Sequence, residues 1–341
     1  MTDNPTVVFV EPGRVRVDSQ AVPTPDATEV LVETSRSLIS TGTELTALSG
    51  EYPPESLWDE YSSYPTEPGY CNVGTVIEAG SEVDDELVGQ RVATRSSHRR
   101  YVTTDVESSF CVPIPEGISD ETATFFALAG IAMNGVRRGD VSWGDDVVIY
   151  GTGLVGQLAA RVCNLAGARS VAGFDLATER LAYLPDATGV VPANPESEDP
   201  ETVVTDATGG KLADVVFETT GVPETIVDQL AVLRERGRLV MLSSPRGETT
   251  IDFHDHCNHP SYEIVGAHEL SHPPEATHPW THDTHEWTHR RHYELFFELV
   301  AEDRLSAAEL VSHRVPFDEA PATYDSLLDD RSDAMGVVIE W

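Results

Sequence analysis

Short apolar runs, each bounded by turn-forming residues, make up the first third of the chain. β-Branched and aromatic residues dominate these runs, and Pro12, Gly13, Gly80 and Pro113 separate them, which is the pattern of short strands. We predict strands at residues 6–10, 15–17, 29–34, 73–78, 91–93 and 101–104. This part of the chain is therefore expected to be a β-rich domain.

One long segment without this pattern, residues 51–68, interrupts the predicted strands. It is rich in proline and contains Trp58, Tyr61 and Tyr64. Long loops in compact domains often carry function, and their aromatic side chains can line a pocket. The alternative, a surface loop whose aromatic residues pack on their own domain, stays equally open.

The pattern changes after residue 118 to helices alternating with buried strands. Ser119, followed by Asp120 and Glu121, is typical of a helix start, and this helix is expected to reach residue 138. Such alternation indicates an α/β fold with a doubly wound parallel sheet. We predict strands at 147–150, 170–174, 214–220, 237–244, 261–267 and 336–341, and helices from 154 to a stop at Gly167, at 223–234 and around 295–305.

The turn after the strand at 147–150 reads G-x-G-x-x-G, with Gly151, Gly153 and Gly156 in the fixed positions. The first glycine permits a tight turn, the second lets backbone approach a pyrophosphate, and the third lets the helix pack on the strand. Leu154 and Val155 open that helix, whose free N–H groups and positive dipole end suit phosphates. The pattern predicts a dinucleotide site; a glycine-rich turn that binds nothing is the alternative.

Asp175 ends the next predicted strand, 19 residues past the last glycine. A carboxylate at this point accepts hydrogen bonds from ribose hydroxyls and repels a 2′-phosphate. The nearest arginine, Arg180, does not follow it directly. We therefore predict NAD(H) as the cofactor, in a site that Arg180, Thr219, Thr220 and Ser243 complete.

The charge of the chain is extreme, with 58 acidic and 22 basic residues, a formal net charge of −36 and one lysine, Lys211. The acids are spread along the whole sequence, so they do not indicate a disordered acidic tail. Self-repulsion of this size destabilises a compact fold at low salt, and we predict a salt-rich cytoplasm, as in a halophile. The same charge argues against nucleic acid or an anionic membrane as a partner.

Cysteine spacing and hydropathy argue against a disulfide-rich, secreted or membrane-spanning protein. The four cysteines share no C-x-x-C spacing, so neither a disulfide framework nor a four-cysteine zinc lobe is predicted. The first residues lack the regions of a signal peptide, and the longest apolar run, 125–133, is too short to span a bilayer. We expect a soluble, cytoplasmic protein.

Three short motifs and the order of the domains resemble a known superfamily. Residues 40–44 read STGTE, residues 68–74 read PGYCNVG, and residues 88–92 read VGQRV. Together with the Rossmann domain behind them, they resemble the medium-chain dehydrogenase/reductase superfamily, the alcohol dehydrogenase-like proteins, over essentially the whole chain. The first two motifs are most similar to a zinc-poor branch that includes bacteriochlorophyllide dehydrogenase-like proteins.

The resemblance implies a GroES-like β-barrel catalytic domain at 1–117, a Rossmann NAD-binding domain with its linking helix at 118–292, and a segment at 293–341 that returns to the catalytic domain. It also implies a small-molecule substrate and a homodimer or homotetramer. The expected activity is hydride transfer between NAD(H) and an alcohol or carbonyl group. The alternatives are a zinc-independent reductase of enone or quinone C=C bonds and a cofactor-binding protein without turnover.

The residues that bind the catalytic zinc in the superfamily are replaced here. By the resemblance, Thr41, Tyr70 and Ala127 stand where zinc ligands would be, and Glu44 and Cys71 are the only potential ligands left at these motifs. A catalytic zinc needs about three nitrogen, sulfur or oxygen ligands from the protein. We therefore predict no metal site and no zinc cofactor.

Without zinc, a hydroxyl or an acid has to take or give the substrate proton. The candidate proton donors are Tyr70, Thr41 and Thr43. Glu44 could orient these hydroxyls or relay the proton. The alternative is structural: Thr43 and Glu44 hold the barrel loop, and Tyr70 fills the volume that the zinc would occupy.

Ten of the twelve histidines lie between His254 and His292. The last five, at 278, 282, 285, 289 and 292, would form one stripe on a continuous helix. Such a stripe either binds a metal or is a polar stripe at a surface or subunit contact, in a chain that avoids lysine. We favour the polar stripe, because Pro279 opposes a helix at the first step and no cysteine or acid completes a ligand set.

Overall fold

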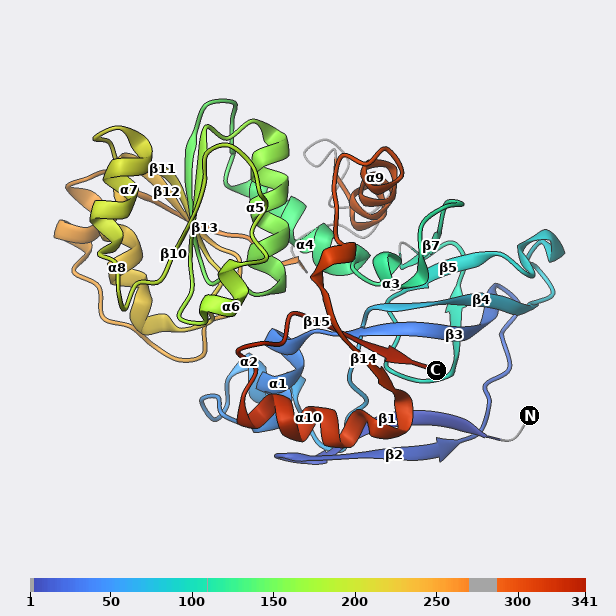
Figure 1. Ribbon diagram of the computed structural model, residues 1–341. Helices are drawn as coiled ribbons and strands as arrows, with labels where there is room; N and C mark the ends of the chain where they lie inside the picture. Colours follow the sequence, from blue (N-terminus) through green and yellow to red (C-terminus); the bar gives the residue numbers. More distant parts are fainter. Residues whose placement is uncertain (1–2, 109, 270–286) are drawn as a thin grey trace. The chain divides into compact units, whose positions relative to one another are not determined.

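The computed structural model describes residues 3–108, 110–269 and 287–341. The chain forms two compact units, a first unit of Met1–Ala127 with Pro273–Trp341 and a second unit of Leu128–His272 (Figure 1). This is the predicted α/β fold, with a β-rich unit and a Rossmann unit. Within the described ranges, none of the helices combines the length and the apolar character that crossing a membrane requires.

Two sheets form the first unit. One consists of β1 and β2, and the other runs in the order β14-β15-β3-β4-β5-β7, with β6 paired to β3. All six strands predicted for this part are confirmed, and β15 pairs antiparallel with β3, so the end of the chain joins this sheet. The strands are β1 (Asn4–Glu11), β2 (Arg14–Gln20), β3 (Glu29–Ile39), β4 (Asn72–Ala79), β5 (Arg91–Thr94), β6 (Tyr101–Asp105), β7 (Cys111–Pro113), β14 (Val311–Pro316) and β15 (Gly336–Glu340).

Two helices of the first unit, α1 and α10, contribute side chains to a buried core around Phe9, Leu48 and Tyr324. Tyr64 of the 51–68 segment packs against this core, as expected if the loop packs on its own domain. Tyr61 of the same segment is 63% exposed. The helices are α1 (Thr41–Ser49), α2 (Leu57–Tyr61), α3 (Asp120–Ala123), α9 (His289–Ala301) and α10 (Ala320–Asp329), with short turns at Asp85–Leu87, Ala308–Leu310 and Phe317–Glu319.

The single helix predicted from Ser119 to residue 138 is wrong in one respect, because the chain breaks it into α3 and α4 (Phe126–Arg138). Ser119 does cap α3, and its hydroxyl accepts a hydrogen bond from the Thr122 N–H at 3.1 Å. The Phe125 N–H then bonds to the Thr122 carbonyl, three residues back. Such a contact tightens the last turn and interrupts the regular α-helical ladder.

The second unit is a parallel sheet in the order β10-β9-β8-β11-β12-β13. The strand order reverses between β8 and β11, and ligands bind at the carboxyl ends of strands at such a point. The predicted helix at 223–234 is shorter than expected, because β12 already begins at Leu233. The elements are β8 (Asp146–Tyr150), α5 (Leu154–Ala166), β9 (Ser170–Phe174), α6 (Thr178–Leu181), β10 (Val190–Ala193), α7 (Pro200–Thr208), β11 (Ala213–Glu218), α8 (Ile226–Ala231), β12 (Leu233–Met241) and β13 (Glu263–Gly266), with a 3₁₀-helix at Pro223–Thr225 and a π-helix at His254–Asn258.

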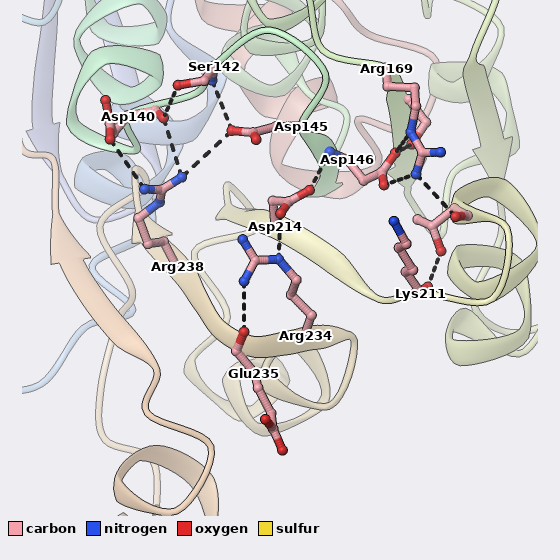
Figure 2. A network of polar contacts seen from close by, with 12 residues as sticks. Asp140, Ser142, Asp145, Asp146, Arg169, Lys211, Asp214, Arg234, Glu235 and Arg238 are labelled. Carbon is pink, nitrogen blue, oxygen red and sulfur yellow. Dashed lines mark hydrogen bonds and ion pairs between the residues drawn. The ribbon is translucent and has the colours of Figure 1, made fainter.

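An ion-pair network ties together the amino ends of β8, β11 and β12 (Figure 2). Asp146 accepts from Arg169 Nε at 3.0 Å, and its own N–H donates to Asp214 at 2.8 Å. Asp214 also accepts from Arg234 Nε at 2.5 Å. These acids are therefore held by arginines at the edge of the sheet opposite to the G-x-G-x-x-G loop, and they serve the sheet rather than the cofactor site.

Candidate active site and cofactor site

Only glycine fits the first and third positions of the G-x-G-x-x-G loop. Gly151 has φ +93°, and a Cβ on it would lie 2.8 Å from the Thr219 carbonyl carbon. A Cβ on Gly156 would lie 2.0 Å from the carbonyl oxygen of Gly151. The loop therefore turns sharply at Gly151, and α5 packs directly against it at Gly156, as the motif predicts.

Gly153 has a different environment. It is the N-cap of α5 and has φ −68°, and a Cβ on it would meet no atom within 4 Å. Gly153 has no side chain with which to cap this helix, and among the described residues none accepts from the N–H groups of Leu154 and Val155, which remain for a ligand. An uncapped helix start beside open space suits a phosphate group.

Asp175 joins the end of β9 to the glycine loop. Its Oδ2 accepts from the Thr152 N–H at 2.8 Å, and its Oδ1 accepts from the Ala177 N–H at 2.9 Å. The carboxylate is thus fixed at the mouth of the loop and remains partly exposed. Arg180 supports the same region through its carbonyl, which accepts from Gln157 Nε2 at 2.8 Å.

The other predicted cofactor residues hold the loops after β11 and β12. The Thr219 hydroxyl lies 2.6 Å from the carbonyl oxygens of Tyr150 and Gly151, so it fastens the glycine loop. Thr220 donates to Glu218 Oε1 through its N–H at 2.7 Å and its hydroxyl at 2.6 Å, and the Ser243 hydroxyl donates to Glu218 Oε2. Glu218 is fully buried. The sequence reading missed it, although an acid at the end of an apolar strand is a usable signal.

Tyr70 and Ser40 meet in the first unit. The Tyr70 hydroxyl lies 2.6 Å from the Ser40 hydroxyl. The Arg95 guanidinium lies 5.1 Å from the centroid of the Tyr70 ring and 5.1 Å from that of Phe110, within cation–π range of both. The predicted proton donor is therefore half-buried, held at its hydroxyl and flanked by a cation.

Glu44 is 3% exposed, and both of its oxygens accept hydrogen bonds. Oε1 accepts from the Ser40 N–H at 2.8 Å, and Oε2 accepts from His98 Nε2 at 3.0 Å and from the Tyr324 hydroxyl. Burial, and then the Glu44 charge, raises the pKa of Tyr324 well above its ordinary value, so Tyr324 stays a donor. Glu44 thus orients its neighbours, and His98, which the sequence reading missed, is part of the same cluster.

Thr41 and Thr43 lie in the first turn of α1, and both are half-buried. The Thr41 carbonyl accepts from Arg331 at 3.3 Å. Among the residues that the structure describes, neither threonine hydroxyl has a hydrogen-bond partner.

The residues at the zinc positions do not fit a zinc ion. Across residues 3–108, 110–269 and 287–341, no three or more His, Cys, Asp or Glu side chains are grouped to hold a metal. Glu44 is fully engaged, Cys71 is completely buried and Ala127 has no donor atom. Of the predicted histidine stripe, His278, His282 and His285 lie outside the described residues. His289 and His292 lie in the first turn of α9, where the His289 ring is 5.5 Å from that of Phe110 and the His292 ring is 5.3 Å from that of Trp287, measured between centroids. Both are buried, so the predicted polar stripe is wrong at these two positions, which pack against aromatic rings instead.

Comparison with known proteins gives a consistent set of relatives. The sequence model of the family described as zinc-binding dehydrogenase matches residues 155–279. The chain is 29% identical to D-guloside 3-dehydrogenase of Escherichia coli (strain K12) over 276 residues, which cover 79% of this chain and 76% of that protein. It is 31% identical to L-threonine 3-dehydrogenase of Xanthomonas oryzae pv. oryzae (strain MAFF 311018) over 259 residues, which cover 66% of this chain and 73% of that protein.

Solved structures share the fold over almost the whole chain. An Escherichia coli oxidoreductase/dehydrogenase of unknown specificity, involved in membrane biogenesis, has a TM-score of 0.81 at 20% identity and covers 99% of both chains. An alcohol dehydrogenase of Escherichia coli CFT073 complexed with NADH has a TM-score of 0.78 at 17% identity, and a zinc-binding dehydrogenase of Sinorhizobium meliloti 1021 bound to NADP has 0.79 at 21%, each with 100% of both chains covered.

Proposed function

This chain belongs to the zinc-binding dehydrogenase family of medium-chain oxidoreductases, and we propose that it transfers hydride between NAD(H) and an alcohol or carbonyl substrate without a catalytic zinc. The proposed cofactor binding rests on one observation: the space beside Gly153 is open, and it adjoins the uncapped start of α5. Two solved relatives of the same fold carry NADH and NADP, which supports a nicotinamide cofactor.

NAD(H) is proposed over NADP(H) because of Asp175. Its carboxylate is fixed by the N–H groups of Thr152 and Ala177 next to the glycine loop. In this position it would accept hydrogen bonds from ribose hydroxyls and repel a 2′-phosphate. The pyrophosphate would lie at the N–H groups after Gly153, and the bound nicotinamide would supply the hydride donor or acceptor.

Hydroxyl groups would move the proton in place of a metal-bound species. Tyr70 is half-buried beside the Arg95 cation, and the hydroxyls of Thr41 and Thr43 are uncommitted within the described part of the chain. A general acid or base has to lie within hydrogen-bond reach of the substrate oxygen. We assign that role to Tyr70, with the two threonines binding the substrate oxygen.

The charge of −36 further supports a protein adapted to high salt, so activity is best sought at molar salt. NADH oxidation and NAD⁺ reduction would be followed by absorbance with glycosides, β-hydroxy amino acids, polyols, simple ketones and enones. The glycosides and β-hydroxy amino acids are chosen because the two sequence relatives are named for a guloside and for threonine.

Turnover of an alcohol–ketone pair, lost in Tyr70→Phe, would support the proposal. Turnover of enones alone would instead assign a C=C reductase. Tight NADH binding without turnover of any substrate would favour a cofactor-binding protein.

A further inference from the structure

We infer that Ser40 is a positioning residue for Tyr70, which rests on the proposed role of Tyr70 as the proton donor. The Ser40 hydroxyl lies 2.6 Å from the Tyr70 hydroxyl. Within the described residues this is its only hydrogen-bond partner. Ser40 is 5% exposed, so water does not compete freely for the contact.

The Ser40 hydroxyl does not cap α1, although Ser40 stands at the N-cap position of that helix. Ser40 is the N-cap of α1, and a serine there usually accepts from an N–H of the first turn, which stabilises the helix by about 1 kcal/mol. Ser56 and Ser119 do this for α2 and α3, accepting from Asp59 and Thr122. At Ser40 the backbone has ψ 84° and no such side-chain bond forms. The hydroxyl bonds to Tyr70 instead.

The backbone of Ser40 is fixed by Glu44 in place of the missing cap. The Ser40 N–H donates to Glu44 Oε1 at 2.8 Å. Glu44 Oε2 is held in turn by His98 Nε2 at 3.0 Å and by the Tyr324 hydroxyl. Since all four residues are buried, the Ser40 hydroxyl has little freedom to turn away from Tyr70.

His98 is itself oriented by the end of the chain. Trp341 Nε1, which can only donate, donates to the Ser37 hydroxyl at 2.8 Å. That hydroxyl lies 2.8 Å from His98 Nδ1 and can donate to it, which leaves His98 Nε2 to donate to Glu44. A Cβ on Gly69, next to Tyr70, would lie 2.7 Å from the His98 backbone nitrogen, so the Tyr70 segment runs directly against His98.

The chemical consequence concerns the phenol. While Tyr70 is protonated, its O–H can donate to Ser40 or to the substrate oxygen. As the carbonyl carbon of the substrate takes the hydride that NADH would supply, the O–H bond of Tyr70 breaks and its proton passes to the carbonyl oxygen. The Ser40 O–H then donates to the phenolate that remains. A hydrogen bond to the charged form stabilises that form, so Ser40 lowers the barrier through Tyr70 without touching the substrate.

The test is a double-mutant cycle of Ser40→Ala and Tyr70→Phe, with Ser40→Thr to restore a hydroxyl and Ser119→Ala as a matched control that loses a serine doing ordinary capping. Kinetics would use the best substrate from the screen above. Tyr70 would also be followed by NMR of protein with ¹³Cζ-labelled tyrosine, its signal assigned through Tyr70→Phe. The NMR arm needs no substrate.

We expect Ser40→Ala to lower kcat about tenfold with little change in KM, equivalent to about 1.4 kcal/mol. It should have no further effect in the Tyr70→Phe background, because residues that act as one unit are not additive. The Tyr70 signal should shift in Ser40→Ala, return in Ser40→Thr and stay in place in Ser119→Ala.

An equal loss from Ser40→Ala in both backgrounds, or an unmoved Tyr70 signal, would overturn the inference while leaving the proposed function intact. Full turnover in Tyr70→Phe would overturn both, since Tyr70 would then not be the proton donor.

Discussion

Gly153→Ala and Gly156→Ala should separate cofactor binding from folding. A Cβ on Gly153 meets nothing within 4 Å and its φ is −68°, so alanine fits without a clash. Because alanine makes the unfolded chain less flexible than glycine does, the substitution would add about 0.4–1 kcal/mol to the free energy of unfolding. The poorer N-cap preference of alanine costs a similar amount. The free energy of unfolding should therefore stay within about 1 kcal/mol of that of the wild type.

The same methyl group would occupy the space through which a pyrophosphate approaches the loop. We expect Gly153→Ala to weaken NADH binding at least about tenfold, or about 1.4 kcal/mol. Gly156→Ala behaves differently, because its Cβ would lie 2.0 Å from the Gly151 carbonyl oxygen, about 1.4 Å inside ordinary contact. Since backbone cannot swing aside, this variant should lose about 1–3 kcal/mol of stability.

Both quantities can be measured at molar salt, NADH affinity by fluorescence titration and stability by chemical denaturation. Wild-type NADH affinity in a folded Gly153→Ala protein would refute the placement of the pyrophosphate. Unchanged stability in Gly156→Ala would refute the packing of α5 on the glycine loop.

Three further outcomes are expected. NADH should bind at least about tenfold tighter than NADPH because Asp175 would face the 2′-phosphate, and equal affinities in the same titration would contradict this. The melting temperature should fall as salt is diluted from molar to millimolar concentration, because a net charge of −36 loses its screening; a constant value would show that self-repulsion is unimportant. The hydrogen bond from Arg314 lowers the pKa of Glu121, so its contribution to stability is present above the unfolded pKa and is lost as the pH falls through the lower folded value. Glu121→Gln should therefore melt lower than the wild type at neutral pH and no differently in acid, and a gap that persists in acid would argue against the ion pair.

Much of the framework could be predicted from the sequence because it is encoded locally. Strand patterns and glycine spacing predicted the Rossmann sheet, the loop at Gly151 and the end of α5 at Gly167, which adopts the left-handed conformation. Weak or short patterns failed: β7 has three residues, and the break between α3 and α4 follows from a single tight contact at Phe125.

The polar clusters could not be predicted because their members are far apart in the chain. Glu44 meets His98 across 54 positions and Tyr324 across 280. Nothing in the sequence around Glu44 distinguishes an acid that faces substrate from one enclosed by three donors. Ser40 was equally hidden, since a serine before a helix normally serves as its cap.

Hydride transfer after removal of metal tests the central claim most directly. Protein prepared without a histidine tag would be treated with a strong chelator, its metal content determined by elemental analysis, and its turnover measured at molar salt with the best substrate. We expect undiminished turnover in protein that holds no stoichiometric zinc, since Thr41, Tyr70 and Ala127 provide no ligand set. About one zinc per chain, removed together with activity and restoring it when added back, would contradict the account.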